Sequence, residues 1–253
     1  MIKIIIEKCD TCAQQYWCQK DCVTGYIEIQ NGVPRFKDRG RCINCNHCVA
    51  VCPRGAIETD FKAPELPNRM LQLFAEKRSV RFYDSGKEIS KDDLNQILAA
   101  AQTAPTEKNR STVKIYLIKE MLREVYLKAL NFMKAVVEEA GPLHPQYRMI
   151  TELHKNRGPI LWNAEYLVLT VGGQGFFIDA AIASERMQLM AQTLGIGTAY
   201  NGNLIFALNE DKTLKSLIGV SKNERVHTAF AMGVPGVRYY RPVYKENKHI
   251  YYL

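Results

Sequence analysis

The stretch Cys42-Ile43-Asn44-Cys45-Asn46-His47-Cys48-Val49-Ala50-Val51-Cys52-Pro53 determines the fold of the N-terminal part of the chain. Its spacing, C-x2-C-x2-C-x3-C-P, places three thiolates around one cubane iron-sulfur cluster and directs the fourth to a neighbouring cluster. A second cysteine run precedes it, and the two runs hold all eight cysteines. Crossed ligation assigns the cysteines to two 4Fe-4S clusters: Cys9, Cys12, Cys18 and Cys52 to one, and Cys22, Cys42, Cys45 and Cys48 to the other.

Zinc and disulfide bonds are the alternatives for so many cysteines. Zinc sites usually pair two C-x2-C knuckles, and secreted disulfide scaffolds are much shorter and lack the C-x2-C-x2-C triplet. We therefore predict two 4Fe-4S clusters, and we expect metal binding to stabilise the fold of this segment.

Residues 1 to about 60 resemble the two-cluster bacterial ferredoxins, which also have a counterpart of Gly55-Ala56-Ile57 after the second cysteine run. The chain departs from that family in two places. Its first run carries three extra residues within Ala13 to Trp17, and Val23 stands where the family often has proline. His47, between two cluster cysteines, is either an exposed loop histidine, which the residue type favours, or a hydrogen-bond partner of a cluster sulfur.

The chain is too long for a ferredoxin alone, because 253 residues suit one small domain and one of ordinary size. We predict a ferredoxin-like domain at 1–60, a linker at 61–68 that contains Pro64 and Pro67, and a second domain at 69–253. No apolar run approaches 18 residues, and Glu7-Lys8 interrupts the apolar N-terminus too early for a signal peptide. A cytoplasmic location without membrane attachment is expected.

The first functional signal of the second domain is Arg78-Ser79-Val80-Arg81, in which two guanidinium groups and a hydroxyl can converge on one phosphate. Ser90 to Asp93 forms a capping box for a helix with apolar positions at Leu94, Ile97, Leu98 and Ala101. That helix ends before Pro105, and a strand follows at 113–118. The intervening loop is Ala104-Pro105-Thr106-Glu107-Lys108-Asn109.

The arginine pair and this loop resemble the flavin-dependent nitroreductase family, whose motifs are R-S-x-R and A-P-S/T-x-x-N. Further elements fit in order: a helix at 121–139, a buried strand at 164–172, and a small-residue helix from Asp179 to Leu194-Gly195 that matches a family motif. The loop 196–203, with Asn201 and Gly202, matches the family's flavin-edge loop. A strand at 226–232, the turn Gly233-Val234-Pro235-Gly236, and then Arg241 complete the resemblance over about 69–245.

The resemblance implies an α+β fold, here an N-terminal bacterial ferredoxin-like domain followed by a nitroreductase-like α+β domain. It also implies an FMN cofactor and a homodimer in which the helix from Asp179 packs against its symmetry mate. The loop with Pro105, Thr106 and Asn109 would reach the flavin of the partner subunit. The predicted FMN-binding residues are Arg78, Ser79, Arg81, Pro105, Thr106, Asn109, Asn201, Gly202 and Arg241.

The formal charge of +8 would suggest a nucleic-acid partner, but it does not include the charges of the prosthetic groups. Two oxidised clusters at about −2 each and a flavin phosphate at about −2 bring the holoprotein near +2. No block of five Lys or Arg occurs, so we expect no nucleic-acid partner.

These features predict an oxidoreductase that passes electrons from ferredoxin or NAD(P)H through two 4Fe-4S clusters to FMN, and on to an organic acceptor such as a nitroaromatic or quinone. The sequence offers no catalytic triad or paired carboxylates, so we predict no separate catalytic residue. One alternative is a non-enzymatic electron relay to a protein partner. Another is a dehalogenating or flavin-fragmenting relative on the same fold.

Overall fold

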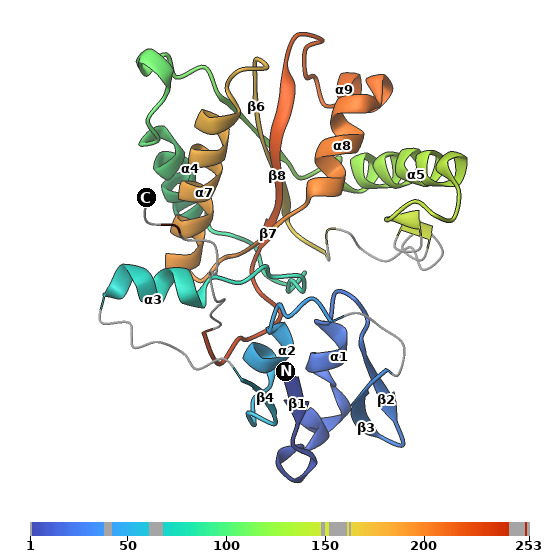
Figure 1. Ribbon diagram of the computed structural model, residues 1–253. Helices are drawn as coiled ribbons and strands as arrows, with labels where there is room; N and C mark the ends of the chain where they lie inside the picture. Colours follow the sequence, from blue (N-terminus) through green and yellow to red (C-terminus); the bar gives the residue numbers. More distant parts are fainter. Residues whose placement is uncertain are drawn as a thin grey trace. The chain divides into compact units, whose positions relative to one another are not determined.

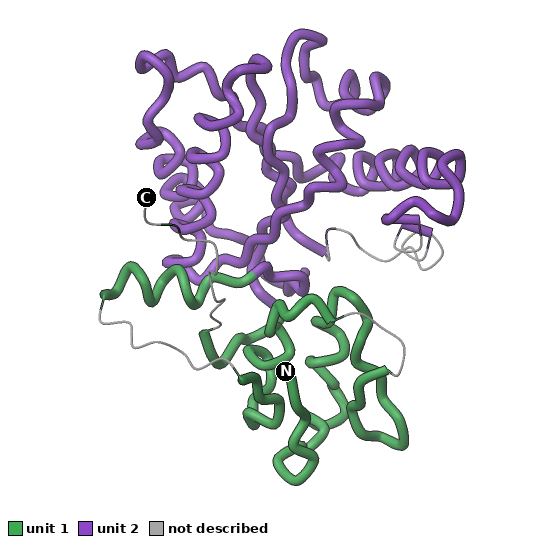
Figure 2. Tube along the Cα trace, viewed as in Figure 1, with its two compact units in different colours: residues 1–78, 237–253 green, residues 79–236 purple. Residues whose placement is uncertain are grey.

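The computed structural model describes residues 2–37, 42–60, 68–147, 150–151, 161, 163–242 and 251. The chain forms two compact units (Figure 2). Unit 1 consists of residues 1–78 and 237–253, and unit 2 consists of residues 79–236. Residues 69–78 and 237–253, which we assigned from the sequence to the second domain, thus group with the N-terminal segment. No described helix is long and apolar enough to cross a membrane.

The described residues of unit 1 form two small antiparallel sheets and short helices (Figure 1). Strand β1 (Ile2–Ile4) pairs with β4 (Ile57–Thr59), and β2 (Ile27–Gln30) pairs with β3 (Val33–Phe36). Positive φ angles of 49° at Asn31 and 75° at Gly32 make the tight hairpin turn that this dipeptide predicts. The other elements are η1 (Ile6–Lys8), η2 (Thr11–Gln14), α1 (Trp17–Lys20), α2 (His47–Val51) and α3 (Arg69–Glu76).

Unit 2 is built on one antiparallel sheet with the strand order β5-β6-β8-β7. The strands are β5 (Lys114–Ile118), β6 (Tyr166–Gly172), β7 (Gly197–Tyr200) and β8 (Arg225–Gly233). In Figure 1, helices α4 (Lys91–Gln102) and α7 (Phe177–Thr193) cover one face. The opposite side holds α5 (Leu122–Ala140), α8 (Gly202–Glu210) and α9 (Lys212–Leu217), and the short helix η3 (Glu107–Asn109) precedes β5.

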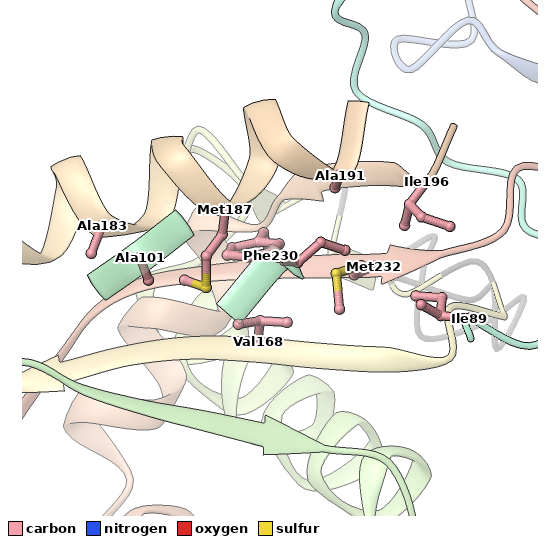
Figure 3. Packing of buried hydrophobic residues seen from close by; sticks show 10 residues of the cluster. Ile89, Ala101, Val168, Ala183, Met187, Ala191, Ile196, Phe230 and Met232 are labelled. Atoms are coloured by element: carbon pink, nitrogen blue, oxygen red, sulfur yellow. The ribbon is translucent and has the colours of Figure 1, made fainter. Parts of the chain in front are cut away.

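The main core of unit 2 lies between α7, α4 and the sheet. Met187 and Phe230 are fully buried there, and Val168 packs from β6 (Figure 3). Helix α4 begins as predicted, because the Ser90 hydroxyl accepts the Asp93 N–H at 3.0 Å. Its residues Ile97 and Ala101 are buried in the same cluster, so the predicted apolar face is confirmed.

The small residues of α7 face the core of their own subunit. Ala180 and Ala191 are completely buried, and Ala183 is 5% exposed and packs in the cluster that contains Ala101 of α4. Small side chains let two helices approach closely, and the helix that approaches here is α4. The expectation that this face packs against the symmetry mate is therefore wrong for Ala183. The large apolar residues that α7 exposes are Phe177 and Ile178.

The strands predicted at 113–118, 164–172 and 226–232 and the helix at 121–139 are confirmed to within two residues. The segment 196–203 differs, because the expected loop contains strand β7 and the start of α8. Its residues Gly197 to Tyr200 pair with β8 along the register Gly197↔Gly233 to Tyr200↔Phe230. Gly197 opens this strand and Gly202 follows it closely, so local propensity favours a loop, and pairing with β8 enforces the strand.

Candidate functional site

Four cysteines of unit 1 line one cavity. Cys9 and Cys12 come from the first loop, Cys18 from α1, and Cys52 from the end of α2. Apolar side chains complete the wall, among them Ile4 and Ile57. These four thiols are the set that crossed ligation predicts for the first cluster. All eight cysteines are free, and among the described residues no three His, Cys, Asp or Glu side chains converge as ligands of a single ion.

Two of the cysteine thiols, Cys18 and Cys48, have a pKa that is raised by burial and by other cysteines. Burial raises the pKa of Cys18 to about 12, and the negative charges of Cys12, Cys52 and Cys9 add to the increase. Burial likewise raises the pKa of Cys48 to about 12, with further contributions from Cys45, Cys22, Cys18 and Cys42. The thiols that act on Cys18 are the other three of its predicted set, and those that act on Cys48 are the other three of its set together with Cys18. A cationic cluster core would make thiolate ligands favourable in both places, because metal coordination deprotonates a thiol.

Backbone amides point at three of the sulfur atoms. Tyr26 N–H donates to Cys22 Sγ at 3.2 Å, Ala56 N–H to Cys52 Sγ at 3.3 Å, and Asn44 N–H to Cys42 Sγ at 3.4 Å. Such hydrogen bonds to cluster sulfurs stabilise the reduced state and raise the reduction potential. These N–H donors therefore fit a sulfur-ligated cluster at each of the two predicted cysteine sets. The assignment of individual ligands stays a prediction.

The first cysteine loop has an unusual backbone. Residues Thr11 to Gln14 have φ angles of 58°, 51°, 50° and 63°, in the left-handed region that non-glycine residues rarely adopt. The Asp10 carboxylate holds this loop, because it accepts from Cys12 N–H at 3.0 Å and from Arg54 Nε at 2.6 Å. The Arg54 contact lowers the pKa of Asp10. We expect a bound cluster to restrain the loop further, since clustered left-handed residues need such support.

His47 is buried, contrary to the favoured sequence interpretation of an exposed loop histidine. It opens helix α2 and is 6% exposed. Its Nδ1 lies 3.1 Å from Oδ2 of Asp21, a carboxylate that is itself 2% exposed. Asp21 directly precedes Cys22, so this buried pair joins the two cysteine runs.

The Ser79 to Arg81 segment runs along the edge strand of unit 2. Ser79 forms a parallel bridge with Thr198, and Val80 N–H donates to Thr198 O at 2.9 Å. Gly197 permits this approach, because a Cβ there would lie 2.8 Å from Val80 side-chain atoms. The structure thus brings Ser79 and Val80 beside β7, the strand that leads into the predicted flavin-edge residues.

The Gly-Val-Pro-Gly turn supports the same segment from the other side. Gly236 N–H donates to Phe82 O at 2.8 Å, and Pro235 bridges to Tyr83. A Cβ on Gly236 would lie 3.1 Å from the Tyr83 backbone, so glycine favours this close contact. Burial raises the pKa of Tyr83, whose hydroxyl donates to Ala231 O at 3.3 Å.

Asn201 and Gly202 lie at the junction of β7 and α8. Asn201 is the N-cap of α8, with Oδ1 accepting the Leu204 N–H at 3.2 Å, and it is 6% exposed. Its side-chain oxygen therefore serves as the helix cap. A Cβ on Gly202 would enter open space, so the backbone there is accessible to a ligand.

The loop with Pro105, Thr106 and Asn109 is held by two side chains of α7. Asp179 Oδ2 accepts the Glu107 N–H at 2.9 Å. At the C-cap of α4, Arg186 Nη1 donates to the carbonyl oxygen of Thr103 and, at 2.6 Å, to its hydroxyl. Pro105 and Asn109 are exposed. No role was predicted for Asp179 from the sequence, although this residue begins the helix motif that matches the family and could have been singled out for that reason.

A cavity of about 540 Å³ opens next to Gly202. Its apolar wall comes from α5 and α8, through Met133, Val136 and Phe206. Its polar lining consists of His144, Gln146 and Asn203. Gln146 Nε2 donates to Asn203 Oδ1 at 3.1 Å, and Gln146 N–H donates to His144 Nδ1 at 3.2 Å. A neutral His144 ring therefore carries its proton on Nε2.

Two predicted phosphate ligands lie in unit 1. Arg78 follows α3, and its Nη2 donates to Ala75 O at 2.6 Å. Arg241 contacts backbone carbonyls at the end of α2. His154 lies outside the described residues.

Comparison with known proteins gives the family. The nitroreductase family model matches residues 74–234, and a 4Fe-4S binding domain model matches residues 36–58. No curated protein sequence matches the chain. Because the first match covers more than half of the chain, the protein belongs to the nitroreductase family. It is an oxidoreductase of that family with a ferredoxin-like 4Fe-4S motif.

Solved structures agree on the fold. A nitroreductase with bound FMN from Bacteroides fragilis is 24% identical with a TM-score of 0.57, and covers 74% of this chain and 99% of its own. A nitroreductase with bound FMN from Desulfitobacterium hafniense is 19% identical with a TM-score of 0.60, and the match covers 74% of this chain and 100% of that one. A nitroreductase-like protein from Bacillus cereus is 17% identical with a TM-score of 0.51, covering 74% and 94%. At these identities the likeness concerns the fold alone.

Proposed function

We propose that the protein is an iron-sulfur flavoprotein that takes electrons singly through two 4Fe-4S clusters and delivers them in pairs from FMN to a small organic acceptor. The single observation that carries this proposal is the cavity lined by Cys9, Cys12, Cys18 and Cys52, in a chain whose other unit has a nitroreductase fold. A second thiol set around Cys48 supports the second cluster. When bound, the clusters supply one-electron steps and the flavin supplies the conversion to two-electron chemistry.

The residues of unit 2 can hold FMN without a catalytic side chain. Ser79 and Arg81 offer a hydroxyl and a guanidinium for the phosphate, from a segment fixed against β7. The exposed backbone at Gly202 can meet the flavin edge. The FMN-bound structures with the same fold support this cofactor. The exposed loop at Pro105 and Asn109 would serve the partner subunit in a homodimer.

The cavity beside Gly202 is our candidate for the acceptor site. Its volume of about 540 Å³ falls in the usual range for small-molecule sites. The apolar walls from Met133, Val136 and Phe206 suit a flat aromatic ring. Its polar edge, with Asn203 and His144, can orient the oxygen atoms of a quinone or nitro group, and a neutral His144 offers Nε2–H as a donor.

The competing proposal is a relay that passes electrons to a protein partner without turning over small molecules. Anaerobic steady-state assays separate the two: reduced ferredoxin and NAD(P)H would be compared as donors over a panel of quinones and nitroaromatics. Saturable turnover of a small acceptor is the expected result. Reduction of the flavin without turnover of any panel member would favour the relay. Release of halide or breakdown of FMN would identify the dehalogenating or flavin-fragmenting alternative.

A further inference from the structure

The chain segment that follows β8 packs on the ferredoxin-like part of unit 1. Three consecutive residues, Tyr239, Tyr240 and Arg241, each contact a different part of the 47–53 segment. The Tyr239 ring lies edge-on to His47 with centroids 5.7 Å apart, and Tyr240 N–H donates to Ala50 O at 2.8 Å. We call residues 239–241 the C-terminal strap.

Arg241 makes the most concentrated contact of the strap. Its Nη1 donates to Cys52 O and lies 3.5 Å from Val49 O, while Nη2 lies 3.5 Å from Pro53 O. The last carbonyls of a helix have no partner within the helix and carry partial negative charge. Val49 O is one of these carbonyls, and Cys52 O and Pro53 O directly follow the helix, so the guanidinium contacts backbone carbonyls at the point where α2 ends and Cys52 lies.

The local sequence makes room for this side chain. Gly55 has a φ of 63°, and a Cβ at that position would lie 2.8 Å from Arg241 Nη2. Glycine therefore suits the left-handed backbone and leaves the space that Arg241 occupies. The same turn presents Ala56 N–H to Cys52 Sγ at 3.3 Å. Arg241 thus supports the backbone that also donates to the cluster sulfur.

We propose that the C-terminal strap is a functional part of the ferredoxin-like unit, and that Arg241 is a positioning residue that raises the reduction potential of the cluster bound through Cys52. A fixed positive charge favours the reduced cluster, because reduction adds one negative charge nearby. This inference rests on the proposed clusters. It replaces the sequence-based prediction that Arg241 binds the FMN phosphate, since the guanidinium is engaged with three carbonyl groups.

The test compares Arg241→Gln with Arg238→Gln in the full-length holoprotein. Arg238 is a matched control, because it belongs to the same segment and is exposed, with its guanidinium over the Tyr240 ring at 5.1 Å. Iron and flavin would be counted first, and each cluster's midpoint potential would then be measured by an anaerobic redox titration followed by electron paramagnetic resonance. Wild-type protein without iron would end the cluster proposal itself, before the strap is tested.

In Arg241→Gln we expect the midpoint potential of one cluster to become more negative by about 59 mV, which corresponds to about a tenfold change in a one-electron reduction equilibrium. The variant protein should retain FMN. Arg238→Gln should leave both potentials unchanged. Unchanged potentials in an iron-replete Arg241→Gln variant that has lost FMN would overturn the inference in favour of phosphate binding. If Arg241→Gln fails to hold iron, Arg241→Lys is the second test, because it keeps the positive charge. We expect Arg241→Lys to keep both clusters near their wild-type potentials. Loss of iron from Arg241→Lys as well would refute a role for the charge.

Discussion

The Asp179 carboxylate accepts the backbone N–H of Glu107 at 2.9 Å and so connects the first turn of α7 to the exposed loop after α4. Asp179 is 8% exposed, which makes this hydrogen bond a largely desolvated one. The loop carries Pro105, Thr106 and Asn109, the residues proposed to reach a flavin. Asp179 therefore acts on the proposed site through the position of a loop rather than through direct contact.

Asp179→Ala is expected to weaken FMN binding without unfolding unit 2. Loss of a hydrogen bond to a charged group typically costs about 1.5 to 3 kcal/mol, which would appear here as a looser loop. Flavin affinity would be measured by fluorescence quenching in the apoprotein. Asp179→Asn keeps an acceptor oxygen and is expected to bind FMN closer to wild type. Equal affinity for wild type and Asp179→Ala would show that the loop does not contribute to the flavin site.

Arg81→Ala should lower flavin affinity roughly 10- to 150-fold, because it removes a charge-assisted bond of about 1.5 to 3 kcal/mol to the phosphate. Arg123→Ala, which removes an exposed arginine on α5, is the control and should not change it. Isothermal titration of the apoprotein with FMN and with riboflavin would locate the effect. The phosphate assignment fails if Arg81→Ala weakens the binding of both ligands equally.

Val136→Trp should fill the cavity beside Gly202. We expect KM for aromatic acceptors to rise about tenfold or more, equivalent to about 1.4 kcal/mol, while the rate of flavin reduction by the donor is unchanged. Ala135→Trp is a matched control on the same helix, because Ala135 is exposed. Stopped-flow measurement of the two half-reactions separates these effects. An unchanged KM in Val136→Trp would move the acceptor site elsewhere.

Ile178→Asp tests the proposed homodimer. Ile178 is 57% exposed and neighbours Phe177, which is 59% exposed, so a partner subunit would bury apolar surface here. Obligate dimer interfaces bury upwards of about 2,000 Å², and a charge inside one should release monomers together with FMN. Light scattering with absorbance detection reports both. Thr193→Asp, at an exposed position near the end of the same helix, is the control and should stay dimeric. If Ile178→Asp also stays dimeric, this face is not part of the interface.

The sequence predicted most of the architecture because its strongest signals are local. The cysteine spacing, the Ser90 cap and the apolar period of α4 each act within a few residues, and the structure reproduces them. The failures concern long-range contacts. His47 is buried because Asp21 and Tyr239 pack against it, and Ala183 faces α4 rather than the symmetry mate. The contacts of Arg241 could not be found by motif order, because they depend on where the chain turns after β8.

The central claim is that one chain carries two clusters and a flavin in electronic communication. Anaerobic coulometric titration of the purified protein counts its electrons most directly. We predict about four electrons per chain, one for each of two clusters and two for FMN, with about eight irons. Cys48→Ala should take about three, because one cluster is lost while the flavin stays. An uptake of two electrons by folded wild-type protein, with iron absent after anaerobic reconstitution, would contradict the account.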